Sequence, residues 1–418
     1  MQSTHRIVYV VPHSHIDVEW YWTIAETRAW TRDILSKAFA LLRQDAGYRF
    51  TQDQTFLLED WWQTANEEER AFLRRVVQEK RFAVVGGAYV QPELDEPCAE
   101  ALIRQILVGQ AWLQETFGIR ARCGWFIDCF GQIPQMPQIL RRAGYEYNVF
   151  WRDIPPDIDF DAMPADFHWE APDGSRILTH WMPGSYGYNV NQARMALHHS
   201  NTDLIFEPWG GDVVRPSGDS AAIRDECAAL MAEACGRDLE FRVATALDYM
   251  HDLSAAADDL PVLTYDFSPA QRAHDLRGTY DNRIELKKRN RAAEAALLGA
   301  EMLAAVAWTR GESYPANVLE NAWRALLFTQ FHDTIGGSNY DPVYVTAMER
   351  LQGVLDSTEH LAQQCLGGMV QGGEAHHTGS HAVYNTLSFA RRELCRVTVP
   401  SSDLQAAGSL TMEARSGE

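Results

Sequence analysis

The stretch that decides the fold of this chain is Val8-Tyr9-Val10-Val11-Pro12-His13-Ser14-His15-Ile16-Asp17-Val18-Glu19-Trp20. Residues 6–11 form a short run rich in β-branched apolar side chains, which is typical of a buried strand in a parallel sheet. The run ends at Pro12, because proline has no N–H to donate to a neighbouring strand. We therefore expect residues 6–11 to form a strand and the residues after Pro12 to lie at its carboxyl end.

Two histidines and an aspartate alternate along the chain after this strand. In extended backbone, side chains two residues apart point the same way, so His13, His15 and Asp17 can face one pocket. Neutral imidazole and carboxylate are the usual non-thiol ligands of a divalent metal such as zinc. A strand end with solvated polar residues also explains one such pattern, but further chemistry-bearing residues follow downstream.

The succession of strand, polar end and helix repeats along the chain. Predicted strands cover residues 48–57, 82–90, 121–127 and 147–152, and predicted helices cover residues 23–44, 58–78, 98–117 and 135–143. This alternation indicates an α/β fold with a parallel sheet, in which ligands gather at the carboxyl ends of the strands. The polar residues at these ends are His15, Asp17, Glu93, Asp128 and Arg152.

The pattern changes at residue 284. Residues 284–308, 316–331 and 341–366 have long helical periodicity, and their short connections predict a three-helix bundle packed against the preceding domain. After a linker, residues 382–384 and 393–399 are strand-like, but about 35 residues are too few for an independent sheet domain. The predicted domains are a β/α domain at 1–280, a bundle at 281–368, a linker at 369–381 and the start of a truncated β domain at 382–418.

Composition limits the class of protein. The 418 residues are 46% hydrophobic and 22% charged, which predicts a soluble globular protein of two or three domains. A net charge of −20 makes nucleic acid and anionic membranes poor partners. No stretch approaches the roughly 20 apolar residues of a membrane span, and the first residues lack a signal-peptide core. Seven scattered cysteines without a C-x-x-C pair favour a reducing cytoplasm. The sequence is compatible with a homo-oligomer.

Two further stretches carry residues of the metal-ligand type. Asp128 lies at a predicted strand end between aromatic residues, although an aspartate there could simply cap the next helix. His332 and Asp333 lie at a predicted helix end, where a favourable dipole contact and a turn would also explain them. Together with His15 and Asp17, these residues supply two histidines and two aspartates, enough for a four-ligand metal site.

These stretches resemble the signatures of the α-mannosidases of glycoside hydrolase family 38. The matching segments are His13-Ser14-His15-Ile16-Asp17 with Trp20, residues 87–93, residues 125–140, Gly278-Thr279-Tyr280 with Arg283 and Lys287, and residues 331–337. The resemblance runs in order from about residue 7 to 345. It implies a seven-stranded β/α barrel, a three-helix bundle and, from residue 382, the start of a β-sandwich region.

The resemblance also implies roles for individual residues. The implied zinc ligands are His15, Asp17, Asp128 and His332, and the implied sugar contacts are Trp20, Phe130, Arg152 and Asp333. Asp128 would double as the nucleophile of a retaining enzyme that hydrolyses terminal α-mannosides through a covalent mannosyl-enzyme. His13 is not expected to be a ligand, and Gln132 stands where the family usually has histidine.

A retaining glycosidase needs a second carboxyl group as general acid. Asp266 and Asp275 lie between Tyr265 and Gly278, where the family places this residue. We prefer Asp266, because it follows the strand-like residues 261–264. A surface loop aspartate is the simpler explanation of either residue.

Two other functions fit parts of the pattern. A zinc-dependent carbohydrate deacetylase also uses histidine and aspartate at strand ends, with zinc-bound hydroxide as nucleophile. That scheme has no evident place for His332 and Asp333. A non-catalytic mannose-binding remnant is the second alternative, against which the intact ligand set argues.

Overall fold

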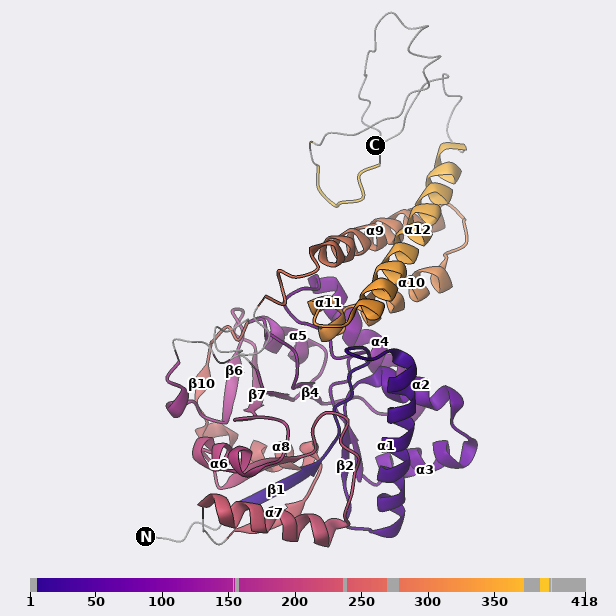
Figure 1. The fold of residues 1–418 in the computed structure, drawn as a ribbon. Helices are drawn as coiled ribbons and strands as arrows, with labels where there is room; N and C mark the ends of the chain where they lie inside the picture. Colours follow the sequence, from indigo (N-terminus) through magenta and orange to yellow (C-terminus); the bar gives the residue numbers. More distant parts are fainter. Residues whose placement is uncertain are drawn as a thin grey trace, which may run out of the picture. The chain divides into compact units, whose positions relative to one another are not determined.

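A computed structural model describes residues 6–152, 154, 158–235, 239–268, 278–371, 384–390 and 392 (Figure 1). The chain divides into two compact units, the first formed by Met1–Glu294 with Arg324–Gln352 and the second by Ala295–Trp323 with Gly353–Glu418. Helices and strands alternate through the first unit, so the fold is mixed α/β.

The elements of the chain follow one another in a regular order. The first are β1 (Ile7–Pro12), α1 (Ile24–Gln44), β2 (Phe50–Gln52), α2 (Thr55–Thr64), α3 (Glu67–Gln78), β3 (Phe82–Val84), α4 (Ala99–Phe117), β4 (Cys123–Phe126), α5 (Met136–Arg142) and β5 (Tyr147–Phe150). Next come η1 (Phe160–Ala162), β6 (Asp166–Glu170), β7 (Arg176–Trp181), α6 (Val190–His199), β8 (Leu204–Trp209), α7 (Ser220–Cys235), β9 (Glu240–Val243), α8 (Ala246–Leu253), η2 (Ser254–Asp259) and β10 (Val262–Leu263). The last are α9 (Ile284–Thr309), α10 (Ala316–Thr329), α11 (His332–Gly336) and α12 (Asp341–Gln371).

Most predicted elements up to residue 152 are confirmed, but one predicted helix is two. Residues 58–78 were expected to be continuous, whereas α2 ends at Thr64 and α3 begins at Glu67. Asn66 separates them: its side chain accepts a hydrogen bond from the Glu69 N–H, and the Glu69 carboxylate accepts one from the Asn66 N–H. This capping box satisfies N–H groups that have no partner inside the helix and starts a new helix there.

Strand pairing places β1 at the centre of its sheet. The described strands form three sheets, ordered β8-β1-β9, β10-β6-β7-β5-β4 and β2-β3. All of their pairings are parallel, as predicted, except that β6 and β7 pair antiparallel. The difference follows from the short connection, Ala171–Ser175, which closes with a hydrogen bond from the Ala171 N–H to the Ser175 carbonyl oxygen and is too short for a parallel crossover.

The core holds the strand ends close together. Tyr9, Val11, Val85, Trp125 and Ile127 belong to one buried cluster, although they come from three parts of the sequence. Burying one large apolar side chain contributes about 1.5–3 kcal/mol to the stability of the folded protein. A parallel bridge joins residue 13, after β1, to residue 51 in β2, and the N–H of residue 86, after β3, donates to the carbonyl oxygen of residue 123 in β4. The segments that follow β1, β2, β3 and β4 therefore lie side by side.

The three long predicted helices near the C-terminal end are present as α9, α10 and α12. Among the described residues, α9 alone is long and apolar enough to cross a membrane. The most apolar part of this helix is 39% buried. Core helices of soluble proteins can be equally long and apolar, so this is weak support for a membrane span. The strand-like residues 393–399 and most of 382–384 lie outside the described residues.

Close packing of α4 against the segment after β3 generates a stability prediction. A Cβ at Gly109 would lie 2.3 Å from the Gly87 carbonyl oxygen, whereas a Cβ at Gly299 in α9 would meet nothing within 4 Å. We expect Gly109→Ala to destabilise the protein by about 1–3 kcal/mol through overpacking. Gly299→Ala should stabilise it by about 0.5–1 kcal/mol through helix propensity. Denaturant unfolding followed by circular dichroism measures both, and a gain in both variants would contradict the close contact.

Candidate metal and catalytic site

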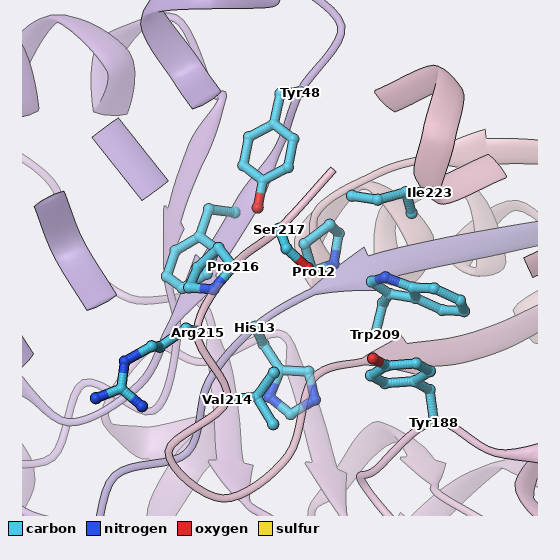
Figure 2. Close-up of a pocket in the computed structure, with 11 residues that line it drawn as sticks. Pro12, His13, Tyr48, Tyr188, Trp209, Val214, Arg215, Pro216, Ser217 and Ile223 are labelled. Carbon is cyan, nitrogen blue, oxygen red and sulfur yellow. The ribbon is translucent and has the colours of Figure 1, made fainter. Parts of the chain in front are cut away.

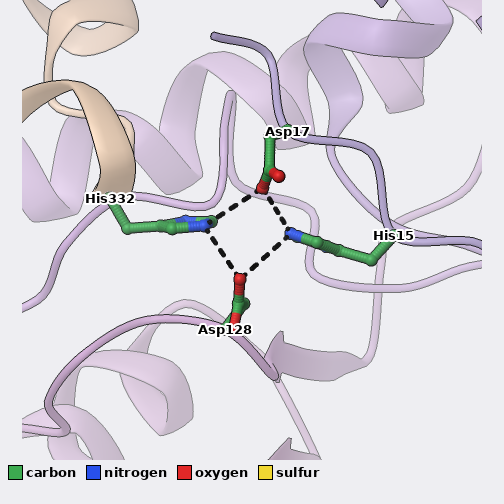
Figure 3. A group of neighbouring side chains, drawn as sticks. All are labelled: His15, Asp17, Asp128 and His332. Carbon is green, nitrogen blue, oxygen red and sulfur yellow. Dashed lines mark hydrogen bonds and ion pairs between the residues drawn. The ribbon is translucent and has the colours of Figure 1, made fainter. Parts of the chain in front are cut away.

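Four buried side chains converge in the first unit, namely those of His15, Asp17, Asp128 and His332 (Figure 3). One ligand-type atom from each lies within 4.8 Å of all the others. His15 Nε2 lies 3.0 Å from Asp17 Oδ1 and 3.8 Å from Asp128 Oδ2. His332 Nε2 lies 3.4 Å and 3.5 Å from the same two oxygens. Nitrogen and oxygen therefore alternate around the group.

The group fits a divalent metal ion. Ligand atoms about 2.0–2.1 Å from a tetrahedral ion lie about 3.4 Å from one another, and the four neighbouring separations, 3.0–3.8 Å, bracket that spacing. His332 Nε2 is buried and makes no hydrogen bond. A buried polar atom is normally paired, so a ring nitrogen that faces two carboxylates without a hydrogen bond suits a metal ligand.

The backbone after β1 orients the first two residues. The His15 N–H donates to the Gly211 carbonyl oxygen at 3.1 Å, and His15 Nδ1 is bound to Asp53 Oδ2 at 3.0 Å. These contacts direct Nε2 toward Asp17. The carbonyl oxygen of Asp17 accepts a hydrogen bond from the Thr27 hydroxyl at 2.9 Å. The side chain of His15 and the backbone of Asp17 are thus held by groups that do not face the site.

The segment after β3 holds the other two residues. His332 is the first residue of α11, and its Nδ1 donates to the Gln91 carbonyl oxygen at 2.9 Å. With its hydrogen on Nδ1, the neutral ring would present the Nε2 lone pair to a bound metal ion. Asp128 follows β4, and its N–H donates to Gln91 Oε1 at 2.9 Å.

Opposite charges compensate one another in this buried site. Burial lowers the pKa of His15 and His332, but the neighbouring carboxylates outweigh it and raise both pKa values well above the ordinary range. Burial would raise the pKa of Asp128, but Arg152 and the two histidines hold it well below its ordinary value. Arg152 donates two hydrogen bonds to Asp128 Oδ1, at 2.9 and 2.5 Å. Asp128 therefore stays ionised, as a nucleophile or a metal ligand must.

Three of the residues expected to contact sugar, Phe130, Arg152 and Asp333, lie next to the four. The Phe130 ring lies edge-on to His332, 5.9 Å between ring centres, and Arg152 lies 5.3 Å from the centre of the Phe130 ring. Asp333 Oδ2 lies 3.6 Å from His332 Nε2. The Trp20 carbonyl oxygen accepts a hydrogen bond from the N–H of Tyr340, which follows α11, at 3.2 Å.

The two candidate acids are placed differently. Asp266 is exposed, and its Oδ1 accepts a hydrogen bond from the Ser268 N–H at 2.9 Å. The carbonyl oxygen of the next residue, Phe267, accepts a hydrogen bond from the Gln132 N–H at 2.9 Å. The segment that carries Asp266 therefore lies alongside the segment that carries Asp128. Asp275 lies outside the described residues.

His13 and Gln132 lie outside the four-residue group. His13 Nε2 is bound to the Tyr186 carbonyl oxygen at 2.8 Å, and burial lowers the pKa of His13 to about 4. Its ring lines a separate small pocket, on whose other side Tyr188 stacks on Trp209 with 4.2 Å between ring centres (Figure 2). Gln132 is buried and donates from Nε2 to the Phe126 carbonyl oxygen at 3.2 Å.

The sequence analysis placed Glu93 at a predicted strand end without a role, and Asp53 and Gln91 also lie next to predicted strands. Asp53 holds His15, as described above, and Gln91 holds Asp128 and His332. Glu93 Oε2 accepts a hydrogen bond from the Phe130 N–H at 2.8 Å, and its Oε1 accepts one from the Tyr280 hydroxyl at 2.8 Å. Their position at strand ends was the one available signal, because their partners lie far away in the sequence.

Comparison with known proteins agrees with the geometry. The N-terminal domain of glycosyl hydrolases family 38 matches residues 5–266, which is more than half of the chain, and the alpha mannosidase middle domain matches residues 274–369. The chain belongs to glycosyl hydrolase family 38. The resemblance found in the sequence is therefore confirmed.

Curated relatives and solved structures place the chain within that family. It is 28% identical over 422 residues to Alpha-mannosidase 2C1 of Mus musculus, covering 96% of this chain and 38% of the relative. It is 27% identical over 364 residues to Alpha-mannosidase of Saccharomyces cerevisiae, covering 81% of this chain and 32% of the relative. The crystal structure of an alpha-mannosidase from Enterococcus faecalis V583 shares the fold, with a TM-score of 0.77 and 24% identity over 88% of this chain and 43% of that one. The chain thus spans about a third of the length of these curated relatives.

Glu93 generates a prediction about pH. Burial and the charge of Asp95 raise the pKa of Glu93 to about 8, so its carboxyl group is neutral in the folded protein at pH 6. The unfolded chain ionises this group above a pH of about 4.3, so its contribution to stability is lost as pH rises from there through 8. Glu93→Gln cannot ionise and should lose less stability than wild type between pH 6 and pH 9.

Glu93→Leu serves as the matched comparison. It removes the acceptors of the Phe130 N–H and the Tyr280 hydroxyl, which should cost about 1–3 kcal/mol at pH 6. Denaturant unfolding at the two pH values measures all three proteins. Identical pH dependence of wild type and Glu93→Gln would show that Glu93 is ionised in the folded protein.

Proposed function

We propose that this chain is the catalytic part of a zinc-dependent retaining α-mannosidase that hydrolyses terminal α-mannosides. The observation that carries the proposal is the convergence of two imidazole nitrogens and two carboxylate oxygens on one buried point, with Arg152 on Asp128. The relatives described above are α-mannosidases, which supports the substrate class. A deacetylase scheme leaves His332 without a role, although His332 lies in the group.

The four converging residues, His15, Asp17, Asp128 and His332, would hold the zinc ion. When bound, zinc supplies a Lewis acid that can accept vicinal sugar hydroxyls and keeps the neighbouring carboxylate ionised. The ion would also link the segment after β1 to α11, which are more than 300 residues apart in the sequence.

The side chains of this chain would carry out the reaction in two steps. In the first, the Asp128 carboxylate attacks the anomeric carbon while the bond to the leaving oxygen breaks, and the general acid, proposed to be Asp266, protonates that oxygen. In the second, water attacks the anomeric carbon of the mannosyl-enzyme, the deprotonated acid takes the water's proton, and Asp128 leaves as a carboxylate. Two inversions at the same carbon give net retention.

Four neighbouring side chains would bind the sugar. The aromatic rings of Trp20 and Phe130 offer apolar faces for the C–H face of a mannose ring. Arg152 and Asp333 offer charged and polar groups for its hydroxyls. Burial, together with the charge of Asp17, raises the pKa of Asp333 well above its ordinary range, so its carboxyl group can act as a donor as well as an acceptor.

We also propose the finer architecture and setting. The proposed architecture has four parts: a seven-stranded β/α barrel over 1–280, a three-helix bundle over 281–368, a linker over 369–381 and the start of a β-sandwich region over 382–418. The contacts between strand ends and the long helices α9, α10 and α12 support this division. A cytoplasmic location is supported by the described cysteines 98, 123, 129, 227 and 365, which are all free thiols. Homo-oligomer formation stays open.

Hydrolysis of an aryl α-mannoside by the zinc-loaded protein tests the function. NMR of the first-formed sugar should show the α configuration, and treatment with a chelator should abolish turnover until zinc is returned. Asp128→Ala should lower kcat by about 10³-fold or more, because the nucleophile is lost. The aryl β-mannoside serves as the control and should not react. A β-configured first product would assign Asp128 the role of a base and overturn the proposed mechanism.

The choice of acid has its own test. Removing the acid should slow substrates with poor leaving groups by about 10²–10⁴-fold, and nitrophenyl mannosides far less, because only the former need protonation. We expect Asp266→Asn to show this split and Asp275→Asn to behave like wild type. The opposite result would transfer the role to Asp275.

A further inference from the structure

Gln91 makes hydrogen bonds to two of the four residues of the proposed metal site, Asp128 and His332, although it contributes no atom to the group of four. It lies in the segment after β3 and is 2% exposed. Its side chain and its main chain each make hydrogen bonds to residues that carry or orient the ligands. These residues lie after β2 and β4 and at the start of α11.

The side-chain amide joins Asp128 to the support of His15. Gln91 Oε1 accepts the Asp128 N–H at 2.9 Å, and Gln91 Nε2 donates to Asp53 Oδ2 at 3.2 Å. The same Asp53 oxygen is bound to His15 Nδ1 at 3.0 Å. Only one orientation of the amide works, because the flipped amide would turn its NH2 toward the Asp128 N–H and its oxygen toward the Asp53 carboxylate.

The main chain of Gln91 reaches the other two ligands. Its carbonyl oxygen accepts from His332 Nδ1 at 2.9 Å and from the His332 N–H at 3.2 Å. Its N–H donates to Gln54 Oε1 at 3.1 Å, and Gln54 Nε2 donates to the carbonyl oxygen of Ile16 at 2.9 Å. Ile16 lies between His15 and Asp17, so this path fixes the backbone that carries both.

We propose that Gln91 is the positioning residue that sets the spacing of the metal ligands and of the nucleophile, an inference that rests on the proposed metal site. Hydrogen-bonding partners behind metal ligands orient them, and their loss weakens metal binding. In this site one residue supplies such partners to Asp128 and His332 directly and to His15 through Asp53. Because the four ligands stand on separate segments, a shared partner couples positions that the backbone leaves independent.

Gln91→Met tests the side-chain half of this role, because methionine keeps the length of the side chain and removes both hydrogen bonds. Gln110→Met is the matched control: Gln110 is also a buried glutamine, and it bonds the N–H and the carbonyl oxygen of Ala121, at 3.0 and 2.9 Å, away from the ligands. Zinc affinity is measured by competition with a chromophoric chelator, and folding by circular dichroism and denaturant unfolding.

We expect Gln91→Met to weaken zinc binding about 10- to 100-fold and to lower kcat more than it changes KM. Gln110→Met should lose stability but bind zinc within about threefold of wild type, since it has no contact with a ligand. Gln91→Asn keeps an amide, but its shorter side chain cannot reach both Asp128 and Asp53. It should therefore also weaken zinc binding. It serves as the second variant if Gln91→Met does not fold.

Two results would overturn the inference, and they are distinguishable. Wild-type protein that binds no zinc would refute the proposed metal site, and this inference with it. Wild-type protein that binds zinc and hydrolyses α-mannoside, with Gln91→Met or Gln91→Asn binding zinc as tightly as Gln110→Met, would refute the role of Gln91 and leave the proposed function standing.

Discussion

The rest of this structure depends on one constraint: four ionisable side chains are buried away from water, and their charges must be compensated inside the protein. His15, Asp17 and His332 are at most 2% exposed and Asp128 is 7% exposed, yet all four are ionisable. A buried charge is tolerated only where opposite charge and hydrogen bonds replace the lost water. The alternation of nitrogen and oxygen around the group meets this requirement from within, and a divalent ion would meet it by replacing the histidine protons.

Hydrogen bonds from outside the group keep it in place. Asp53 holds His15, Arg152 holds one oxygen of Asp128, and Gln91 holds Asp128 and His332. Arg152 binds Oδ1 of Asp128, whereas the two histidines face Oδ2. The two oxygens of one carboxylate therefore have separate partners, which fits a residue proposed to bind metal and to attack the sugar.

Close backbone approach brings these partners within reach. Gly109 in α4 lies against Gly87, and Gly87 has a positive φ of 64° and would place a Cβ 2.5 Å from that of Ala121. A larger residue at either position would push the segment after β3 away from β4. That segment carries Gln91 and Glu93, so this close packing helps to set the position of both residues in the site.

The sequence by itself determined most strands and helices up to residue 152, the long helices after residue 284, the family and the four candidate ligands. These depend on local patterns: the apolar run that ends at Pro12, the helical periodicities, and histidines and aspartates at strand or helix ends. It also contained the capping box of Asn66 and Glu69, which divides α2 from α3, but the continuous helical periodicity concealed it.

Tertiary structure alone decided the supporting hydrogen bonds of the site. Gln91 is 37 residues from Asp128 and 241 from His332. No local pattern relates residues at such separations, because their distance depends on how the sheets pack and on where α11 begins. The residue types that can bind a metal were therefore visible in the sequence, whereas the groups that orient them became visible only in the folded chain.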